Sequence, residues 1–291
     1  AASISAPVFS ARWFAPRWWL TWLALGLMRL LSLLPIRAQL ALGEALGRAL
    51  GHVARSRREV VRTNLRLCFP GMPADERERW VNAHFAALGR GLFETTLAWF
   101  ATDEQLAPLM EIEGREHLDA ALAGGQGFLL LTGHFSSLEI GARVLRVKAQ
   151  LPFHAMYRPY ANPVMDYYMH LWRGRQAGLP ALPRDDLRRL VRALRDGRAI
   201  WYAPDQTLGR SMAVFAPFFG VPALTVSATS RLARMGRARV LPYMPRYTGK
   251  GWCVRFFPML EDFPGEDETL DTARINQALE AGVLLAMDQY F

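Results

Sequence analysis

The sequence predicts an α/β fold in which helices flank a mixed, mostly parallel sheet. The first observation is that short apolar runs alternate with segments of helical spacing from residue 127 onward, the pattern of βαβ units. The second is the uninterrupted apolar run at 128–131, which has glycine on both sides, as in a strand buried on both faces. We expect two parts: an N-terminal membrane-anchoring or interfacial helix within 1–36, and the main domain at 37–291.

The apolar segment at 18–34 is interrupted only by Arg29. Its length lies at the short limit for crossing a bilayer, and the nearby tryptophans with Arg12 and Arg17 are typical of a membrane interface. No small-residue cleavage site follows before Pro35, which argues against a cleaved signal peptide. We therefore expect a membrane anchor or an interfacial helix; a buried helix of a soluble protein is the alternative.

Two helices are predicted between this segment and residue 100. At 37–67, leucines and valines are interleaved with arginines, which predicts a basic amphipathic helix that suits an anionic membrane surface. A solvated helix face is the alternative. Pro70-Gly71 then breaks the chain, and a second helix restarts at Pro73, a favourable first-turn residue, and runs toward Phe100.

The rest of the chain alternates between strands and helices. Further strands are predicted at 153–158, 199–203, 238–243 and 253–257. Helices are predicted from residue 135 onward and at 163–175, 185–195, 225–235 and 271–287. In such sheets, functional residues gather at the carboxyl ends of the strands. His134, Arg158 and Asp205 each follow a predicted strand, so we expect them to share one cleft.

The charge balance limits the possible partners. The 291 residues carry a formal net charge of +9, mainly through arginine, which binds phosphates and carboxylates in a bidentate way. Nucleic acid, an anionic membrane surface, and an acidic carrier or substrate all fit this charge. No nucleic-acid-binding module is recognisable, so we expect no nucleic acid partner. Cys68 and Cys253 are too few for a disulfide framework and indicate a reducing compartment.

Several common enzyme signatures are absent from the sequence. It contains no Gly-x-Ser-x-Gly nucleophile elbow, and no His-Glu-x-x-His or paired Cys-x-x-Cys zinc pattern. A phosphate-binding loop and a convincing dinucleotide-binding glycine fingerprint are also missing. The sequence therefore predicts neither a metal site nor a cofactor.

The candidate catalytic group is a histidine with a nearby carboxylate. His134 lies on the glycine turn after the strand at 128–131, and Glu139 lies near the start of the next helix. On one continuous helix, residues five apart are rotated by about 140°, so the two side chains meet only if His134 stays on the turn. The carboxylate would then hold one imidazole nitrogen and leave the other as a base for an acceptor hydroxyl. A structural hydrogen bond for His134 and a helix-dipole role for Glu139 are the alternatives.

Motifs spread over residues 10–290 resemble those of one enzyme family. Gly-His-Phe at 133–135 with Leu-Glu at 138–139 matches the His-x4-Asp/Glu motif of the lysophospholipid acyltransferase superfamily. The chain as a whole resembles the late lipid A biosynthesis acyltransferases, the lauroyl-transferring branch in particular. The other matching segments are 16–23, 62–70, 91–95, 98–100, 157–159, 201–205 and 214–219.

The resemblance implies a glycerolipid acyltransferase-like fold at the cytoplasmic side of a Gram-negative inner membrane, held by a single N-terminal anchor. It implies transfer of a fatty acyl chain from acyl carrier protein to a hydroxyl of a 3-hydroxyacyl chain on a lipid A precursor. The expected partners are therefore acyl carrier protein, the lipid A precursor and inner-membrane lipids. Two alternatives stay open. One is the same chemistry on a phospholipid, an aminolipid or a phosphatidylinositol mannoside; the other is a non-catalytic protein that binds anionic membranes.

The resemblance also implies roles for individual residues. His134 is expected to be the general base, and Glu139 is expected to orient it. The residues expected to bind substrate are Arg158, Arg173, Arg175 and Asp205. Structural ion pairs for the arginines and a capping role for Asp205 are the alternatives. The apolar segment 214–221 is expected either to line an acyl-chain groove or to belong to the core.

Overall fold

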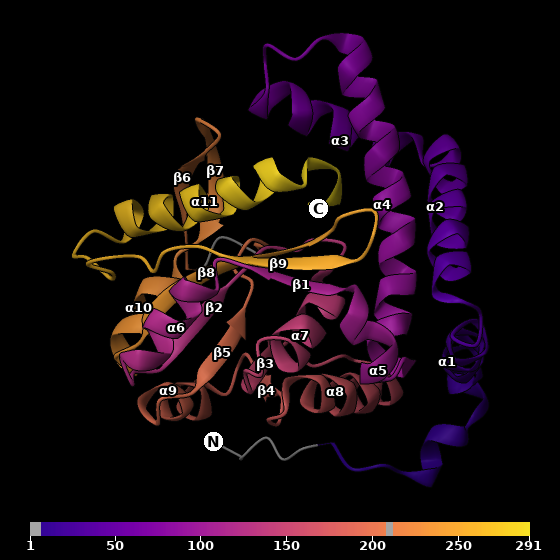
Figure 1. Ribbon diagram of the computed structural model, residues 1–291, viewed down its shortest axis with the longest axis horizontal. Coiled ribbons are helices and arrows are strands. Elements are labelled where there is room, and N and C mark those ends of the chain that lie inside the picture. Colours follow the sequence, from indigo (N-terminus) through magenta and orange to yellow (C-terminus); the bar gives the residue numbers. More distant parts are fainter. Residues whose placement is uncertain (1–6, 208–211) are drawn as a thin grey trace.

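The structure, a computed structural model, describes residues 7–207 and 212–291. A seven-stranded sheet runs through the molecule in the order β1-β9-β8-β2-β5-β3-β4 (Figure 1). All neighbouring strands are parallel except β8 and β9, so the predicted mixed, mostly parallel sheet is confirmed. The strands are β1 (Met110–Glu113), β2 (Phe128–Leu131), β3 (Phe153–Tyr157), β4 (Leu182–Pro183), β5 (Ala199–Tyr202), β8 (Arg239–Tyr247) and β9 (Trp252–Phe256).

Strand β2 shows why its sequence is apolar throughout. Its side chains alternate between two faces, so Phe128 and Leu130 join one hydrophobic core while Leu129 and Leu131 join the other. Burying such a side chain contributes about 1.5–3 kcal/mol, and no position of β2 faces water. The first core includes residues of α6 (Arg115–Ala123), α7 (Leu138–Val147) and α8 (Pro163–Ala177). The second includes residues of α9 (Leu187–Arg195), α10 (Ala228–Gly236) and α11 (Glu268–Leu285).

A separate antiparallel hairpin, β6 (Ala213–Phe218) and β7 (Val221–Val226), packs against α11. Its two turn residues, Phe219 and Gly220, both have positive φ, as a type I′ turn requires. The Phe219 amide donates to Glu280 Oε1 at 2.6 Å, and Asn276 Nδ2 donates to the Pro217 carbonyl at 3.0 Å. Both acceptor and donor side chains belong to α11, which therefore fixes the hairpin at the edge of the fold.

Three helices form the N-terminal side of the main domain: α2 (Ile36–Val53), α3 (Arg55–Cys68) and α4 (Ala74–Phe100) (Figure 1). The single helix predicted at 37–67 is therefore wrong in one respect, because the backbone breaks at Ala54, where ψ is 56°. Helices α2 and α4 approach through glycines: a Cβ on Gly47 would lie 2.1 Å from the Phe85 carbonyl oxygen. Shorter elements are α5 (Asp103–Leu106), η3 (Ala107–Leu109) and η4 (Met287–Gln289).

The arginines of α3 are partly structural. Arg58 Nη2 lies 3.0 Å and Arg62 Nε 2.5 Å from the Glu78 carboxylate on α4. These ion pairs hold α3 against α4, so Arg58 and Arg62 are not free to bind an anionic surface. For Arg58 and Arg62 these ion pairs differ from both expectations for the segment, a face on an anionic membrane and a solvated helix face.

The segment predicted as a membrane anchor or an interfacial helix is helical over a shorter stretch than expected. The segment forms two short turns, η1 (Ala11–Phe14) and η2 (Pro16–Trp18), followed by α1 (Trp19–Leu31). At 1.5 Å per residue, 13 residues extend about 20 Å, less than the hydrocarbon core of about 30 Å. No helix among residues 7–207 and 212–291 is long and apolar enough to span a bilayer. Leu25 packs with Val164 and Trp172 of α8, whereas Leu20, Leu23, Leu27 and Leu30 are exposed.

Candidate functional site

Two neighbouring parallel strands bring the central residues of the site together. Strand β2 ends at Leu131 and β5 at Tyr202, and these two residues are in register. The Thr132 amide donates to the Tyr202 carbonyl at 3.0 Å, which extends the pairing beyond the strands. His134 and Asp205 therefore leave the same edge of the sheet side by side, although 71 residues separate them in sequence.

Asp205 holds His134 at two points. Its Oδ2 accepts the backbone N–H of His134 at 2.7 Å, and its Oδ1 lies 2.5 Å from the imidazole Nδ1. The Asp205 side chain is 2% exposed and that of His134 is 30% exposed. A carboxylate at Nδ1 favours the tautomer with the proton on that nitrogen. Nε2 has no hydrogen-bond partner among the described residues, so its lone pair is available as a base.

The predicted role of Glu139 as the partner of His134 is corrected here. Glu139 Oε1 accepts from Arg173 Nε at 3.0 Å and from Nη2 at 2.5 Å, because the first turn of α7 faces α8. The Arg173 guanidinium also lies 5.0 Å from the centre of the Trp201 ring. Burial alone would lower the pKa of Arg173, but attraction to and hydrogen bonding with Glu139 raise it above its ordinary value. Glu139 thus keeps a buried arginine charged and fixed.

A cavity of about 480 Å³ adjoins His134 and is lined by three arginines, Arg158, Arg173 and Arg184, together with aromatic and apolar side chains. Arg158 follows β3 directly and makes no hydrogen bond or ion pair with any residue that the structure describes. Sequence reasoning missed Arg184, which follows the two-residue strand β4, too short to recognise from its pattern. The cavity therefore combines an unengaged base with positively charged groups that suit anionic substrates.

The structure separates Arg175 from this cavity. Arg173 and Arg175 are two residues apart on α8, hence rotated by about 200° about its axis. Arg175 instead lines a smaller cavity of about 240 Å³ that also contains Arg143 and Arg146 of α7. Arg173 and Arg175 therefore line different cavities, and substrate binding by Arg175 stays a prediction.

A third, apolar cavity of about 770 Å³ lies between α3, α4, the β6–β7 hairpin and the residues after α11. Phe218, Phe219 and Val221 line it, so the segment predicted as groove or core does border a groove. Tyr290 also lines this cavity, and its ring centre is 5.2 Å from that of Phe135, the residue after His134. Tyr290 thus contacts both the apolar cavity and the residue that follows His134.

Comparisons with known proteins point to the same enzyme family as the sequence motifs. A family model described as bacterial lipid A biosynthesis acyltransferase matches residues 6–291. The chain is 37% identical over 287 residues to the lipid A biosynthesis lauroyltransferase of Escherichia coli K12, covering 98% of this chain and 93% of the relative. It is 35% identical over 286 residues to the lipid A biosynthesis palmitoleoyltransferase of the same organism, covering 97% and 92%.

A more distant likeness is to the crystal structure of the 1-acyl-sn-glycerophosphate acyltransferase of Thermotoga maritima. That likeness has a TM-score of 0.40 and 15% sequence identity, and covers 84% of this chain and 97% of the other.

Proposed function

This chain belongs to the bacterial lipid A biosynthesis acyltransferase family and is an acyltransferase of lipid A biosynthesis, and we propose that it uses acyl carrier protein as the donor. The acceptor in this proposal is a hydroxyl of a 3-hydroxyacyl chain on a lipid A precursor. The observation that carries the proposal is the unengaged Nε2 of His134, held by buried Asp205 at the edge of an arginine-lined cavity.

The proposed reaction needs no protein nucleophile. Nε2 of His134 removes the proton of the acceptor hydroxyl while the Asp205 carboxylate stabilises the imidazolium that forms. The hydroxyl oxygen bonds to the thioester carbonyl carbon, the carbon–sulfur bond breaks, and the imidazolium returns its proton to the departing thiolate. General-base catalysis of this kind supplies roughly 10²–10⁴-fold, and the remainder comes from positioning and from stabilising the oxyanion.

The arginines supply positive charge next to this base. Arg173 is fixed by Glu139 and by Trp201, which makes it a preorganised donor for the developing oxyanion. Arg158 and Arg184 are at least partly exposed and are placed in this proposal against anionic groups of the lipid substrate, for which guanidinium geometry is well suited.

The donor chain is proposed to lie in the apolar cavity of about 770 Å³ bordered by Phe218 and Tyr290. A lauroyl-type chain is the proposed donor because one relative is named a lauroyltransferase, although another of similar identity is named a palmitoleoyltransferase. A bound acyl chain would also cover the apolar hairpin residues that line the cavity, such as Phe218 and Val221.

Association with the inner membrane is proposed to occur through the exposed face of α1. Leu20, Leu23 and Leu30 are each more than 60% exposed, and Arg17 and several tryptophans surround them, as in helices that lie in the interfacial layer. A Leu23→Ser/Leu27→Ser double variant should bind vesicles of anionic phospholipid less than wild type. Leu122→Ser, at an exposed position of α6, is the matched control and should bind as wild type does.

The experiment that tests the proposed function uses purified protein, a lipid A precursor and a panel of acyl carrier proteins loaded with chains of different length. Mass spectrometry should detect one added acyl chain on the precursor, with the highest rate for a donor near twelve carbons. His134→Ala should fold normally and give no product above the uncatalysed rate. Turnover of His134→Ala close to that of wild type would refute the proposed mechanism, and acylation of a phospholipid instead of the precursor would refute the proposed acceptor.

A further inference from the structure

The loop that carries His134 is paired with a segment that follows α11. The Ser136 amide donates to the Gln289 carbonyl at 2.7 Å, and the Phe291 amide donates to the His134 carbonyl at 3.1 Å. These two hydrogen bonds flank an antiparallel β-bridge between the loop and the segment. The backbone position of the proposed base is therefore set in part by residues that lie far from it in sequence.

The side chain between those two bonds, that of Tyr290, packs on the same loop. Its ring centre lies 5.2 Å from that of Phe135. A Cβ built on Gly133 would lie 2.8 Å from Cε2 of the ring, so the ring closes the space beside this glycine. The segment therefore touches the loop both before and after His134.

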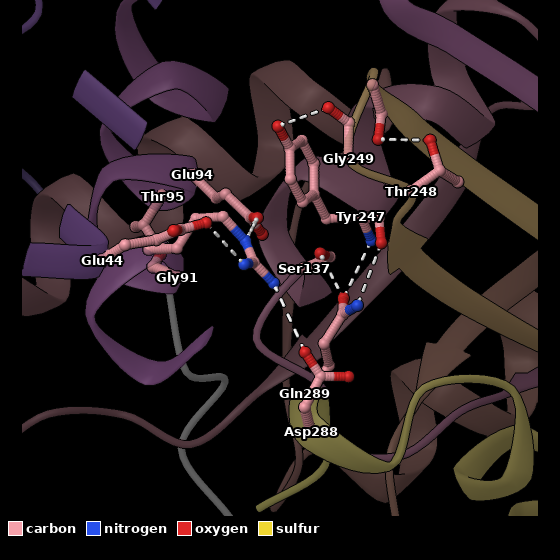
Figure 2. A network of polar contacts seen from close by, with 12 residues as sticks. Glu44, Gly91, Glu94, Thr95, Ser137, Tyr247, Thr248, Gly249, Asp288 and Gln289 are labelled. Carbon is pink, nitrogen blue, oxygen red and sulfur yellow. Dashed lines mark hydrogen bonds and ion pairs between the residues drawn. The ribbon is translucent and has the colours of Figure 1, made fainter. Parts of the chain in front are cut away.

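The Gln289 amide anchors this segment to the central sheet. Its Oε1 accepts from the Tyr247 amide at 2.8 Å, and its Nε2 donates to the Tyr247 carbonyl at 3.0 Å (Figure 2). One side chain thus makes the two bonds that a hydrogen-bonded residue of an antiparallel neighbour would make with the last residue of β8. Oε1 also accepts from Ser137 Oγ at 3.3 Å. Gln289 is 5% exposed, so these bonds are costly to lose.

A charged cluster holds the start of the segment from the helical side. Asp288 Oδ2 lies 4.0 Å from Arg90 Nη2. Arg90 Nε in turn lies 3.1 Å from Glu94 Oε1, and its Nη1 lies 3.0 Å from Glu44 Oε1 (Figure 2). The Arg90 guanidinium carbon is also 4.5 Å from the centre of the Tyr247 ring. The segment is therefore anchored to α2 and α4 as well as to β8.

The segment holds the part of His134 that Asp205 does not hold. Asp205 binds the backbone N–H and the imidazole Nδ1 of His134, whereas the His134 carbonyl accepts from the Phe291 amide. With both sides of the residue bound, its backbone cannot turn, and Nε2 keeps one direction. A general base must lie within about 2.6–3.2 Å of the proton donor, and a displacement of about 1 Å can cost about 10²-fold in rate.

We propose that Gln289 is a positioning residue for the acyl transfer. It acts on His134 through the backbone pairing of residues 289–291 with residues 134–136. Gln289 is not among the residues that line the arginine-lined cavity or the apolar cavity, so it influences the position of the base and not the binding of either substrate. This inference rests on the proposed role of His134 as the general base.

The first variant that tests the inference is Gln289→Met, which keeps the length of the side chain and removes its three hydrogen bonds. We expect kcat to fall by about tenfold, because the base is displaced. The KM for the acyl carrier should stay within about twofold of wild type, because the cavities keep their lining. Hydrogen–deuterium exchange of the backbone amides at 133–137 should become faster as the pairing loosens.

The matched control is the same exchange at Gln39 in α2. Gln39 is 1% exposed, and its Nε2 donates to the Leu34 carbonyl at 2.8 Å and to the Ser32 carbonyl at 3.3 Å. Gln39→Met therefore also removes a buried amide that is bonded to backbone. It should lower the thermal stability but leave kcat and the exchange at 133–137 as in wild type.

A second pair of variants tests the backbone bond to His134 itself. Phe291→Pro and Phe291→Ala both remove the ring that lines the apolar cavity, but only proline removes the N–H that reaches the His134 carbonyl. Tyr290 has φ −94° and ψ 138°, a conformation that a residue before proline adopts readily. We expect kcat of Phe291→Pro to be about three- to tenfold below that of Phe291→Ala.

The outcomes separate the inference from the function on which it rests. If Gln289→Met lowers kcat no more than Gln39→Met does, or if the two Phe291 variants have equal kcat, the inference is overturned. If Gln289→Met does not fold, the comparison of the two Phe291 variants decides alone. These results leave the proposed function standing as long as His134→Ala is inactive. Activity in His134→Ala overturns the proposed function instead.

Discussion

Replacing Asp205 with asparagine is the perturbation that the site geometry makes most informative. The amide keeps the size of the carboxylate and can still accept the His134 backbone N–H, now 2.7 Å from Oδ2. Its NH₂ group would then face Nδ1, now 2.5 Å from Oδ1. A donor at that place favours the imidazole tautomer with the proton on Nε2, and this tautomer cannot act as the base.

The magnitude follows from the loss of both tautomer control and charge. The same exchange in serine protease triads lowers kcat by about 10⁴. We therefore expect a loss of roughly 10³–10⁴-fold for Asp205→Asn, equivalent to about 4–5.5 kcal/mol in the activation free energy. The fold should survive, because the side chain is 2% exposed and the exchange replaces a buried charge by a neutral group of equal volume.

The assay is kcat at saturating acyl carrier donor, and the matched control is the same carboxylate-to-amide exchange at Glu139. Glu139 contacts Arg173 rather than His134, so Glu139→Gln should lower kcat by a smaller factor and reduce stability by leaving Arg173 without its partner. A greater loss of kcat in Glu139→Gln than in Asp205→Asn would refute the assignment of Asp205 as the residue that orients the base.

Three further predictions concern the cavity, the helix packing and the dependence of stability on pH. Ala223→Phe narrows the apolar cavity that Ala223 lines, so the preferred donor in the acyl carrier panel should become shorter. Gly47→Ala places a Cβ 2.1 Å from the Phe85 carbonyl oxygen and should lower the free energy of unfolding by about 1–3 kcal/mol or more, whereas Gly26→Ala, which meets nothing within 4 Å, should not. Burial lowers the pKa of His84 to about 4. The unfolded chain therefore binds that proton from about pH 6.5 downward while the folded chain does not. In urea titrations, the free energy of unfolding of wild type should fall by up to about 3 kcal/mol between pH 6.5 and pH 4. That of His84→Gln should not show this decrease.

The sheet was largely predictable from local patterns. The run at 128–131 is apolar because β2 is covered on both faces, and this arrangement leaves a direct trace in the sequence. Strands β1 and β4 were not predicted, because β1 (Met110–Glu113) has two glutamates among its four residues and β4 has only two residues. The break at Ala54 was missed because apolar and basic residues keep their helical spacing across it.

The proposed catalytic pair was only half predictable. A histidine on a turn after a buried strand indicated the base, and a carboxylate five residues later was the natural partner within reach of sequence spacing. The observed partner of His134 is Asp205. The positions of both residues after predicted strands indicated a shared cleft, but their direct contact depends on β2 and β5 being neighbours, which is a property of strand order and not of either segment. The backbone pairing of residues 289–291 with residues 134–136 depends in the same way on the path that the chain takes after α11.

The central claim, that Asp205 leaves Nε2 of His134 free to act as a base, is tested most directly by nitrogen NMR of the protein labelled with ¹⁵N-histidine. The His134 signals would be assigned by comparison with His134→Gln. The account predicts that at neutral pH the proton resides on Nδ1 and that Nε2 has the chemical shift of an unprotonated imidazole nitrogen. A protonated Nε2 with an unprotonated Nδ1 would contradict it.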